Sequence, residues 1–188
     1  SSSGIYLDYI DGYKNPIISE VTANIIQDIN NSGISLSQAS ANVWDNVITG
    51  KGSSSGIYIY KDESTLNKST LSDTVRDNKI TNFSYGIRLY GEATPIIQYN
   101  DLHDNDYDLF NQINKEKAKE IDARFNYWGE VTTAEMNTGD NPKNITKIYD
   151  TYEDSRWGFV NYGSWLDSSK GNPSSADVTG VLKFTDSG

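Results

Sequence analysis

A pair of short motifs that repeats along the chain is the feature that most limits how these 188 residues fold. The first motif is Asn, any residue, then an aliphatic residue; it begins at Asn24, Asn46, Asn78 and Asn100, and Asn126 begins a related Asn-Tyr-Trp. These asparagines are 22, 32, 22 and 26 residues apart. The second motif, Gly-Ile-x-aliphatic, alternates with the first and begins at Gly4, Gly33, Gly56 and Gly86. In a fifth unit, residues 108–110 occupy the equivalent position but lack the glycine. Two coupled series at one period indicate a solenoid.

The period and the local alternation together favour an all-β coil. Alternation places Ile5 and Leu7 on one face of a short strand, and Ile87 and Leu89 on one face of another. A repeat of about 22 residues closes three short strands and three corners, and stacked coils form parallel strands ~4.8 Å apart. Equivalent aliphatic side chains then form one continuous core. We expect the repeated asparagines to be structural corner residues, because Asn tolerates left-handed backbone and stacked amides bond to one another.

Two longer motifs carry a family resemblance. Residues 78–89 read N-x-I-x-x-x-x-x-G-I-x-L, and the repeats end with N-Y-W-G at 126–129, I-Y-D at 148–150 and V-N-Y-G-S-W-L at 160–166. The chain resembles the right-handed parallel β-helix (pectate-lyase-like) proteins, and its closing segment resembles that of many extracellular β-helix domains. Gly163-Ser164 departs from that family, which often has a polar residue and Pro there. The resemblance implies a right-handed parallel β-helix solenoid of about five to six coils, spanning about residues 4 to 168.

The resemblance also implies how the domain ends. We expect residues 1–166 to form the β-helix with an aromatic C-terminal cap, and residues 167–188 to form a linker or tail whose segment 178–184 is a candidate first strand of a further module. The residues expected to form the cap are Tyr127, Trp128, Trp157, Tyr162 and Trp165. Residues 131–144 are predicted to cross the end as a loop with a short helix at 133–136. Residues 61–74 and 114–120 are predicted to be polar loops.

Composition removes several classes of partner and site. The chain has 26 acidic and 16 basic residues, a net charge of −10, one His and no Cys. Nucleic acids and anionic membranes both require a basic surface, so we expect neither as a partner. No apolar run approaches the ~20 residues of a membrane-spanning helix. Thiolate metal sites and a Cys nucleophile are excluded, and a His-based triad is disfavoured.

Catalytic motifs of enzymes with this fold are mostly missing. The hydrolase motifs N-T-D, D-D and G-H-G are absent, as is the epimerase motif D-P-H-E. A lyase that uses Ca²⁺ and an Arg or Lys base is not excluded, and Arg88 is the best single candidate for the base. The alternative is an exposed Arg88 that pairs with acidic residues between Asn100 and Asp108. His103 is either a proton carrier between carboxylates or a surface corner residue.

Calcium is the only cofactor that the sequence suggests. Asp101, Asp104, Asp106 and Asp108 place four carboxylates within eight residues, and hard oxygen ligands at a turn suit Ca²⁺. The segment lacks the Gly and terminal Glu of an EF-hand loop. The alternative, favoured here, is that these acids are only solvated and that no cofactor is bound.

Outward-facing aromatic residues are the main argument for ligand binding. Where Ile and Leu point inward, the residues between them point outward, which applies to Tyr6, Tyr58, Tyr60, Arg88 and Tyr90. Flat rings along a solenoid suit stacking on sugar rings, so these five residues are the candidate carbohydrate-binding site. The alternative is that the rings pack against their neighbours in the stack.

Three functions remain open. The first, which we favour, is a non-catalytic extracellular or cell-surface module that is adhesive, carbohydrate-binding or a scaffold. The second is a polysaccharide lyase or related carbohydrate-active enzyme. The third is a self-assembling filament or surface-layer subunit, because open parallel edges invite pairing with a second copy. The resemblance implies a secreted or cell-surface setting, and four N-glycosylation sequons, at Asn30, Asn67, Asn82 and Asn144, permit it.

Overall fold

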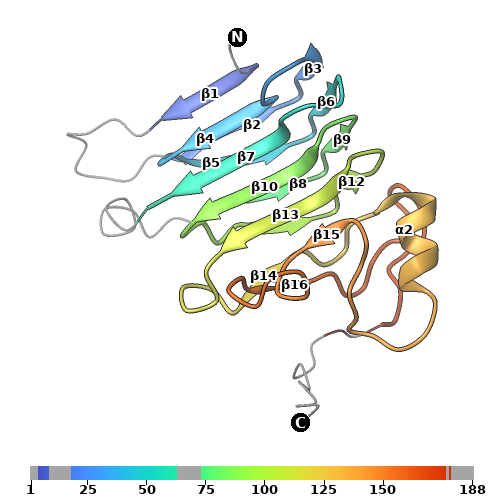
Figure 1. Cartoon of the computed structure of the whole chain (residues 1–188). Helices are drawn as coiled ribbons and strands as arrows, with labels where there is room; N and C mark the ends of the chain where they lie inside the picture. Colours follow the sequence, from blue (N-terminus) through green and yellow to red (C-terminus); the bar gives the residue numbers. More distant parts are fainter. Residues whose placement is uncertain (1–3, 9–17, 63–72, 177, 179–188) are drawn as a thin grey trace.

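Three parallel sheets form the body of the molecule (Figure 1). The computed structural model describes residues 4–8, 18–62, 73–176 and 178. Sheet A contains β1 (Ile5–Asp8), β4 (Ile34–Ser37), β7 (Ser55–Lys61), β10 (Tyr85–Gly91), β13 (Tyr107–Ile113) and β15 (Ile148–Tyr149). Sheet B contains β2 (Ile18–Thr22), β5 (Ser40–Trp44), β8 (Thr74–Arg76) and β11 (Ile96–Gln98). Sheet C contains β3 (Ile25–Ile29), β6 (Val47–Gly50), β9 (Lys79–Thr81) and β12 (Asp101–Leu102).

The chain visits the sheets in the order A, B, C and then starts the next coil. Sheet A has six strands, so the predicted solenoid of about five to six coils is confirmed. At the C-terminal end, β14 (Glu120–Asp122) pairs with β16 (Phe159–Asn161). Figure 1 shows the coils stacked from β1 at one end to β15 and β16 at the other, with α2 (Gly129–Met136) beside that second end.

Inward aliphatic columns form the core. Ile34, Ile57 and Ile87 are directly paired in neighbouring strands of sheet A, and none has exposed surface. Leu109 continues this column in the fifth coil, as predicted from its place in the repeat. The predicted register of the coils is therefore confirmed.

The repeated asparagines form a hydrogen-bonded ladder at the corner between sheets B and C. The side-chain amide of Asn46 donates to Asn78 at 2.9 Å, and that of Asn78 donates to Asn100 at 3.0 Å. Asn24 and Asn126 extend the ladder at its two ends. Amides of the same ladder also donate to backbone carbonyls, as Asn78 does to Val43 at 2.9 Å. The prediction that these asparagines are structural is confirmed.

The residue before each ladder asparagine has a left-handed backbone. These residues are Ala23, Asp45, Asp77, Tyr99 and Phe125, with φ between 55° and 61°. Large aromatic residues rarely take this conformation. The rings of Tyr99 and Phe125 stack on each other at 5.4 Å, so contact between neighbouring coils accompanies the unusual backbone.

The closing segment buries its aromatic residues. Trp128, Tyr162 and Trp165 are buried as predicted for a cap, whereas Tyr127 and Trp157 are half-buried. The helix α2 (Gly129–Met136) begins four residues before the predicted start at residue 133. Tyr162 donates its hydroxyl to Asn141 at 2.9 Å, and the Trp165 indole N–H donates to Asn137 at 3.1 Å. These bonds tie the segment after α2 to the cap.

The residues after the cap fold back against it. Leu166 forms a β-bridge with Pro173, and the backbone N–H of Ser164 donates to the carbonyl of Ala176 at 2.9 Å. Val178 is fully buried in the same core cluster as Trp165. The described residues of the predicted linker, which begins at residue 167, thus contact the β-helix directly. The domain division at residue 166 stays a prediction.

The predicted polar loop over residues 61–74 is wrong at both ends. Lys61 ends β7 and Thr74 begins β8. The Lys61 ammonium and the Asp73 carboxylate are buried and lie 2.8 Å apart. Their placement depends on charge pairing, which hydropathy alone does not reveal. Residues 63–72 lie outside the described residues. The predicted polar loop at 114–120 is observed as far as residue 119, because β14 begins at Glu120.

Candidate functional site

The outward side of sheet A carries the residues predicted to bind carbohydrate. We call the outward side chains of β1, β4, β7, β10, β13 and β15 the aromatic face. One column of this face runs through Tyr6, Ser35, Tyr58, Arg88, Phe110 and Tyr149. A second column pairs Tyr60 with Tyr90 and continues to Gln112. The structure therefore brings the five predicted residues onto one face, with Ser35 between Tyr6 and Tyr58.

The rings of the aromatic face are only partly free. Tyr6 is 58% exposed and Tyr90 is 43% exposed, whereas Tyr58 and Tyr60 are half-buried. The ring centroids of Tyr60 and Tyr90 lie 5.7 Å apart. Burial also raises the pKa of the Tyr58 hydroxyl. Packing against stack neighbours and exposure to solvent therefore coexist on this face.

Arg88 does not pair with the acidic residues between Asn100 and Asp108, so that expectation is wrong. Its guanidinium lies over the rings of Tyr58, Tyr85 and Phe110, at 5.8, 5.1 and 5.8 Å from their centroids. One of its terminal nitrogens donates to the Gln112 side-chain oxygen at 2.9 Å. The cation–π contacts hold it on the outer side of sheet A, and no carboxylate lies beside it among the described residues.

The four aspartates considered for calcium do not form a cluster. Asp108 is buried and accepts a hydrogen bond from Asn105 at 3.0 Å. Asp104 is largely exposed and contacts His103 at 2.7 Å. Within residues 4–8, 18–62, 73–176 and 178, no group of three or more His, Cys, Asp or Glu side chains is placed to hold a metal ion. The arrangement of Asp101, Asp104, Asp106 and Asp108 does not fit a Ca²⁺ site.

His103 is a partly exposed corner residue whose two ring nitrogens contact Asp104 and Asp101, at 2.7 and 3.4 Å. It borders a hollow of about 480 Å³ beside α2, together with Asp108 and Lys147. Burial raises the pKa of the Asp108 carboxyl to about 7. Asp108 occupies the position of the motif glycine in the fifth coil. In earlier coils a side chain at that position would overlap its neighbours, since a Cβ on Gly33 would clash with Ile48 and one on Gly56 with Ile80.

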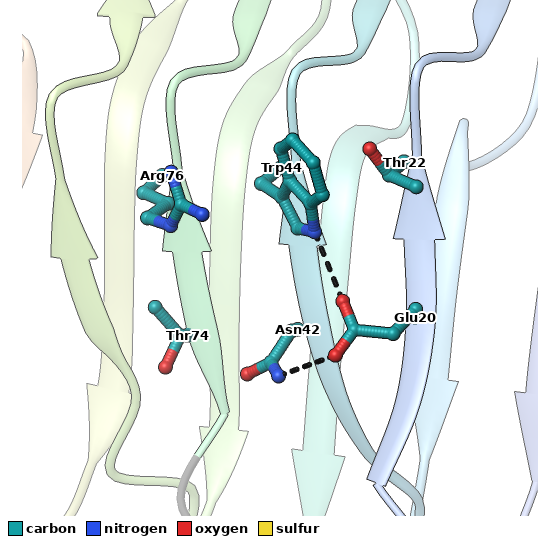
Figure 2. A pocket seen from close by; sticks show the side chains of 6 residues that line it. All are labelled: Glu20, Thr22, Asn42, Trp44, Thr74 and Arg76. Atoms are coloured by element: carbon teal, nitrogen blue, oxygen red, sulfur yellow. Dashed lines mark hydrogen bonds between the residues drawn. The ribbon is translucent and has the colours of Figure 1, made fainter.

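A hollow on the outward side of sheet B is the most structured candidate site. Six side chains line it, Glu20, Thr22, Asn42, Trp44, Thr74 and Arg76, and we call it the Trp44 hollow (Figure 2). Its volume of about 520 Å³ falls within the ~300–1,000 Å³ typical of small-ligand pockets. The six residues come from three neighbouring strands, in two rows of three.

Glu20 is held in position by its neighbours in the next coil. Its two carboxylate oxygens accept hydrogen bonds from the Asn42 amide at 2.7 Å and from the Trp44 indole N–H at 2.9 Å (Figure 2). These two bonds lower the pKa of the Glu20 carboxyl. The side chain is therefore an ionised acceptor with a fixed orientation, and each oxygen keeps capacity for a further donor.

Arg76 and Thr22 flank Trp44 in the same row. The Arg76 guanidinium lies 4.9 Å from the Trp44 ring centroid and also forms an ion pair with Asp77. The Thr22 hydroxyl is shielded from solvent and has no hydrogen-bond partner in the described part of the chain. The hollow thus presents an aromatic ring, a carboxylate, an amide and the Thr74 hydroxyl within one small area.

The Trp44 hollow is not among the sites predicted from the sequence, although the repeat period contains a signal for it. Glu20, Asn42 and Thr74 each lie four residues before a ladder asparagine. Trp44 and Arg76 each lie two residues before one. Projecting the ladder spacing onto these positions stacks them in neighbouring coils. These residues lie outside the Gly-Ile-x-aliphatic runs, from which the outward residues of sheet A are predicted.

Comparison with known proteins gives a family match. A family model described as a right handed beta helix region matches residues 3–115, more than half of the chain. No curated protein and no solved structure matches the chain. Among the described residues, no helix is both long and apolar enough to cross a membrane.

Proposed function

Because the chain belongs to the right-handed β-helix family, whose fold alone does not fix an activity, we propose a function from its surface. The proposal is that the chain is a non-catalytic carbohydrate-binding module of an extracellular or cell-surface protein. The Trp44 hollow is its binding site. The single observation that carries the proposal is the arrangement of Glu20 and Asn42 around the Trp44 ring.

The chemistry of the hollow suits a sugar. A pyranose ring has an apolar face that stacks on an aromatic side chain, and its edge carries hydroxyls that both donate and accept hydrogen bonds. Trp44 supplies the ring. Glu20 supplies acceptors, and Asn42 and Thr74 supply mixed polar groups beside it. Because Glu20 is already fixed by two bonds, little conformational entropy is lost when a sugar hydroxyl adds a third.

Exposed sequons support the extracellular setting. Asn30, Asn82 and Asn144 are all exposed, so each can accept a glycan without disturbing the core. The Trp44 hollow lies on sheet B, and none of these three asparagines lines it. Glycosylation of these sites therefore leaves the proposed binding site free for an adhesive role.

The test is a glycan array run with and without Ca²⁺, followed by titration calorimetry with the glycan that binds. Trp44→Ala should lower the affinity at least tenfold, and Glu20→Gln should lower it several-fold because a charge-assisted acceptor is lost. Tyr152→Ala is the matched control, since Tyr152 is an exposed aromatic residue outside the hollow. Failure of the wild-type protein to bind any glycan, or unchanged binding by Trp44→Ala, would contradict the proposal.

The same preparation tests the non-catalytic part of the proposal. Incubation with acidic polysaccharides and a measurement of ultraviolet absorbance detects unsaturated uronate products. We expect no increase in absorbance above that of a boiled sample. Product formation by wild-type protein would replace the binding module with a lyase.

A further inference from the structure

Arg88 differs from every other arginine of this chain. The four arginines are Arg76, Arg88, Arg124 and Arg156. Arg76 pairs with Asp77, Arg124 with Asp122 at 2.9 Å, and Arg156 with Asp154 at 3.0 Å. Arg88 has no carboxylate partner in the part of the chain that the structure describes, although the chain carries 26 acidic residues.

The Arg88 guanidinium is also short of hydrogen bonds. It has five N–H donors, and one terminal nitrogen donates to Gln112 at 2.9 Å. Its Nε is shielded from solvent and has no partner among the described residues. The rings of Tyr58, Tyr85 and Phe110 stabilise the charge but accept no strong hydrogen bond. A positive group whose terminal nitrogens keep unused N–H donors among the described residues is thus held within an aromatic surface.

The outward side chains next to Arg88 on its own and the two neighbouring strands include no carboxylate. The outward positions of β7, β10 and β13 carry aromatic rings, Arg88 and Gln112, and no carboxylate. Asp62 and Glu92 follow β7 and β10 at the edge, and Glu92 pairs with Lys117 at 2.7 Å. In a chain with a net charge of −10, Arg88 thus offers a positive charge to an anion, with the nearby Asp62 carboxylate hydrogen-bonded to the Tyr60 hydroxyl at the edge of the patch.

We propose that Arg88 is the charge anchor of a second binding site, on the aromatic face, for an anionic polysaccharide whose sugars carry carboxylate or sulfate groups. A guanidinium binds either group through two parallel hydrogen bonds. Tyr58, Tyr60 and Tyr90 surround the anchor with rings on which neighbouring sugars stack. This site lies on sheet A and is independent of the Trp44 hollow on sheet B.

The test compares charged and neutral forms of two polymers by biolayer interferometry. The first pair is polygalacturonate and its methyl ester, and the second is dextran sulfate and dextran. We expect the charged member of at least one pair to bind at least tenfold more tightly than the neutral one, with an affinity that falls as NaCl is added. The pair that responds identifies the carboxylate or the sulfate as the recognised group.

Arg88→Gln removes the anchor and should lower affinity for the charged polymer at least tenfold. Arg156→Gln is the matched control, because it removes the same charge from an exposed arginine that pairs with Asp154, and it should keep affinity within twofold. Trp44→Ala should also keep it. Equal binding by Arg88→Gln and Arg156→Gln would overturn the proposal, as would equal wild-type binding of charged and neutral polymers.

A third variant separates binding from folding. Arg88→Lys keeps the charge but cannot form two parallel bonds, so it should lose part of the affinity while keeping the preference for the charged polymer. Thermal melts monitored by circular dichroism check that each variant is folded. If Arg88→Gln does not fold, the proposal is tested by Arg88→Lys and by wild-type binding to the charged and neutral polymers. A Lys variant that binds charged and neutral polymers equally contradicts the proposed anchor.

Discussion

At the scale of single residues, Ile87 lies between Ile57 and Leu109 in the inward column of sheet A, with no exposed surface. We predict that Ile87→Asp unfolds the protein, because a buried carboxylate without a partner costs more than about 4–5 kcal/mol. Ile25→Asp is the control, since Ile25 is 76% exposed on β3, and it should melt close to wild type. Circular dichroism melts measure both. A wild-type melting curve for Ile87→Asp would refute the register of the coils.

The asparagine ladder makes a second prediction at the same scale. Asn78 accepts from the backbone and side chain of Asn46 and donates to Val43, Arg76 and Asn100. Asn78→Ala leaves these buried groups unpaired, so we expect it to lower the free energy of unfolding by about 2–4 kcal/mol. Urea denaturation is the measurement. Asn24→Ala, at the end of the ladder, should cost less, and an equal cost for both would show that ladder position is unimportant.

At the scale of elements, a buried ion pair joins the end of β7 to the start of β8. Lys61 and Asp73 lie 2.8 Å apart, and the Asp73 carboxylate also accepts from the Ala41 N–H at 3.0 Å. We predict that Lys61→Met lowers stability by about 3–5 kcal/mol, because it leaves the Asp73 charge buried without its counter-charge. Burial raises the pKa of the Asp73 carboxyl, and the Lys61 charge opposes that rise, so removing Lys61 takes away the interaction that favours the ionised form.

Two comparisons make this prediction specific, both measured by urea denaturation. Lys51→Met removes an exposed lysine that lies 3.6 Å from Asp28, and it should cost less than about 1 kcal/mol. The double variant Lys61→Met/Asp73→Asn should recover part of the loss, because no unpaired charge then remains buried. If Lys61→Met costs no more than Lys51→Met, the buried pair does not stabilise the junction of β7 and β8.

The elements that the sequence predicts well are those that repeat. The Asn and Gly motifs repeat in each coil, so the register of sheets A and C follows from their spacing, and Leu109 is placed correctly despite the missing glycine. The aromatic cap follows from the density of large rings at residues 127–165. The start of α2 is missed because Gly129 and Glu130 carry no strong capping signal, and the structure shows no side-chain cap at Trp128.

The elements that the sequence predicts poorly depend on contacts between coils. Arg88 is expected to pair with acids and instead lies over aromatic rings of neighbouring strands. Glu20 and Trp44 are 24 residues apart, and only the stacking of β2 on β5 brings them together. Lys61 and Asp73 read as loop residues because each is polar, and their charge pairing is visible only in three dimensions.

At the scale of the whole molecule, buried carboxyl groups make the stability of the fold depend on pH. Burial raises the pKa of Asp108 from its usual 3.8 to about 7, and that of Asp150 from 3.8 to about 6. Both carboxyls therefore stay protonated in the folded chain at pH values where they ionise in the unfolded chain. Between about pH 4 and pH 7 the folded state binds more protons than the unfolded state, so stability falls as pH rises.

We predict that the melting temperature falls from pH 5 to pH 8, with each buried carboxyl contributing up to about 1.4 kcal/mol per pH unit within its window. Asp108→Asn should flatten the fall between pH 5 and pH 7, because it removes one of the protons involved, and should be at least as stable as wild type at pH 8. Repulsion among surface acids acts in the same direction but is screened by 0.5 M NaCl, whereas the contribution of buried Asp108 is not.

Asp104→Asn, at a largely exposed carboxylate, is the control and should keep the wild-type slope. Scanning calorimetry across this range decides: a melting temperature that rises from pH 5 to pH 8, or an Asp108→Asn slope equal to that of Asp104→Asn, would show that Asp108 is ionised in the folded chain.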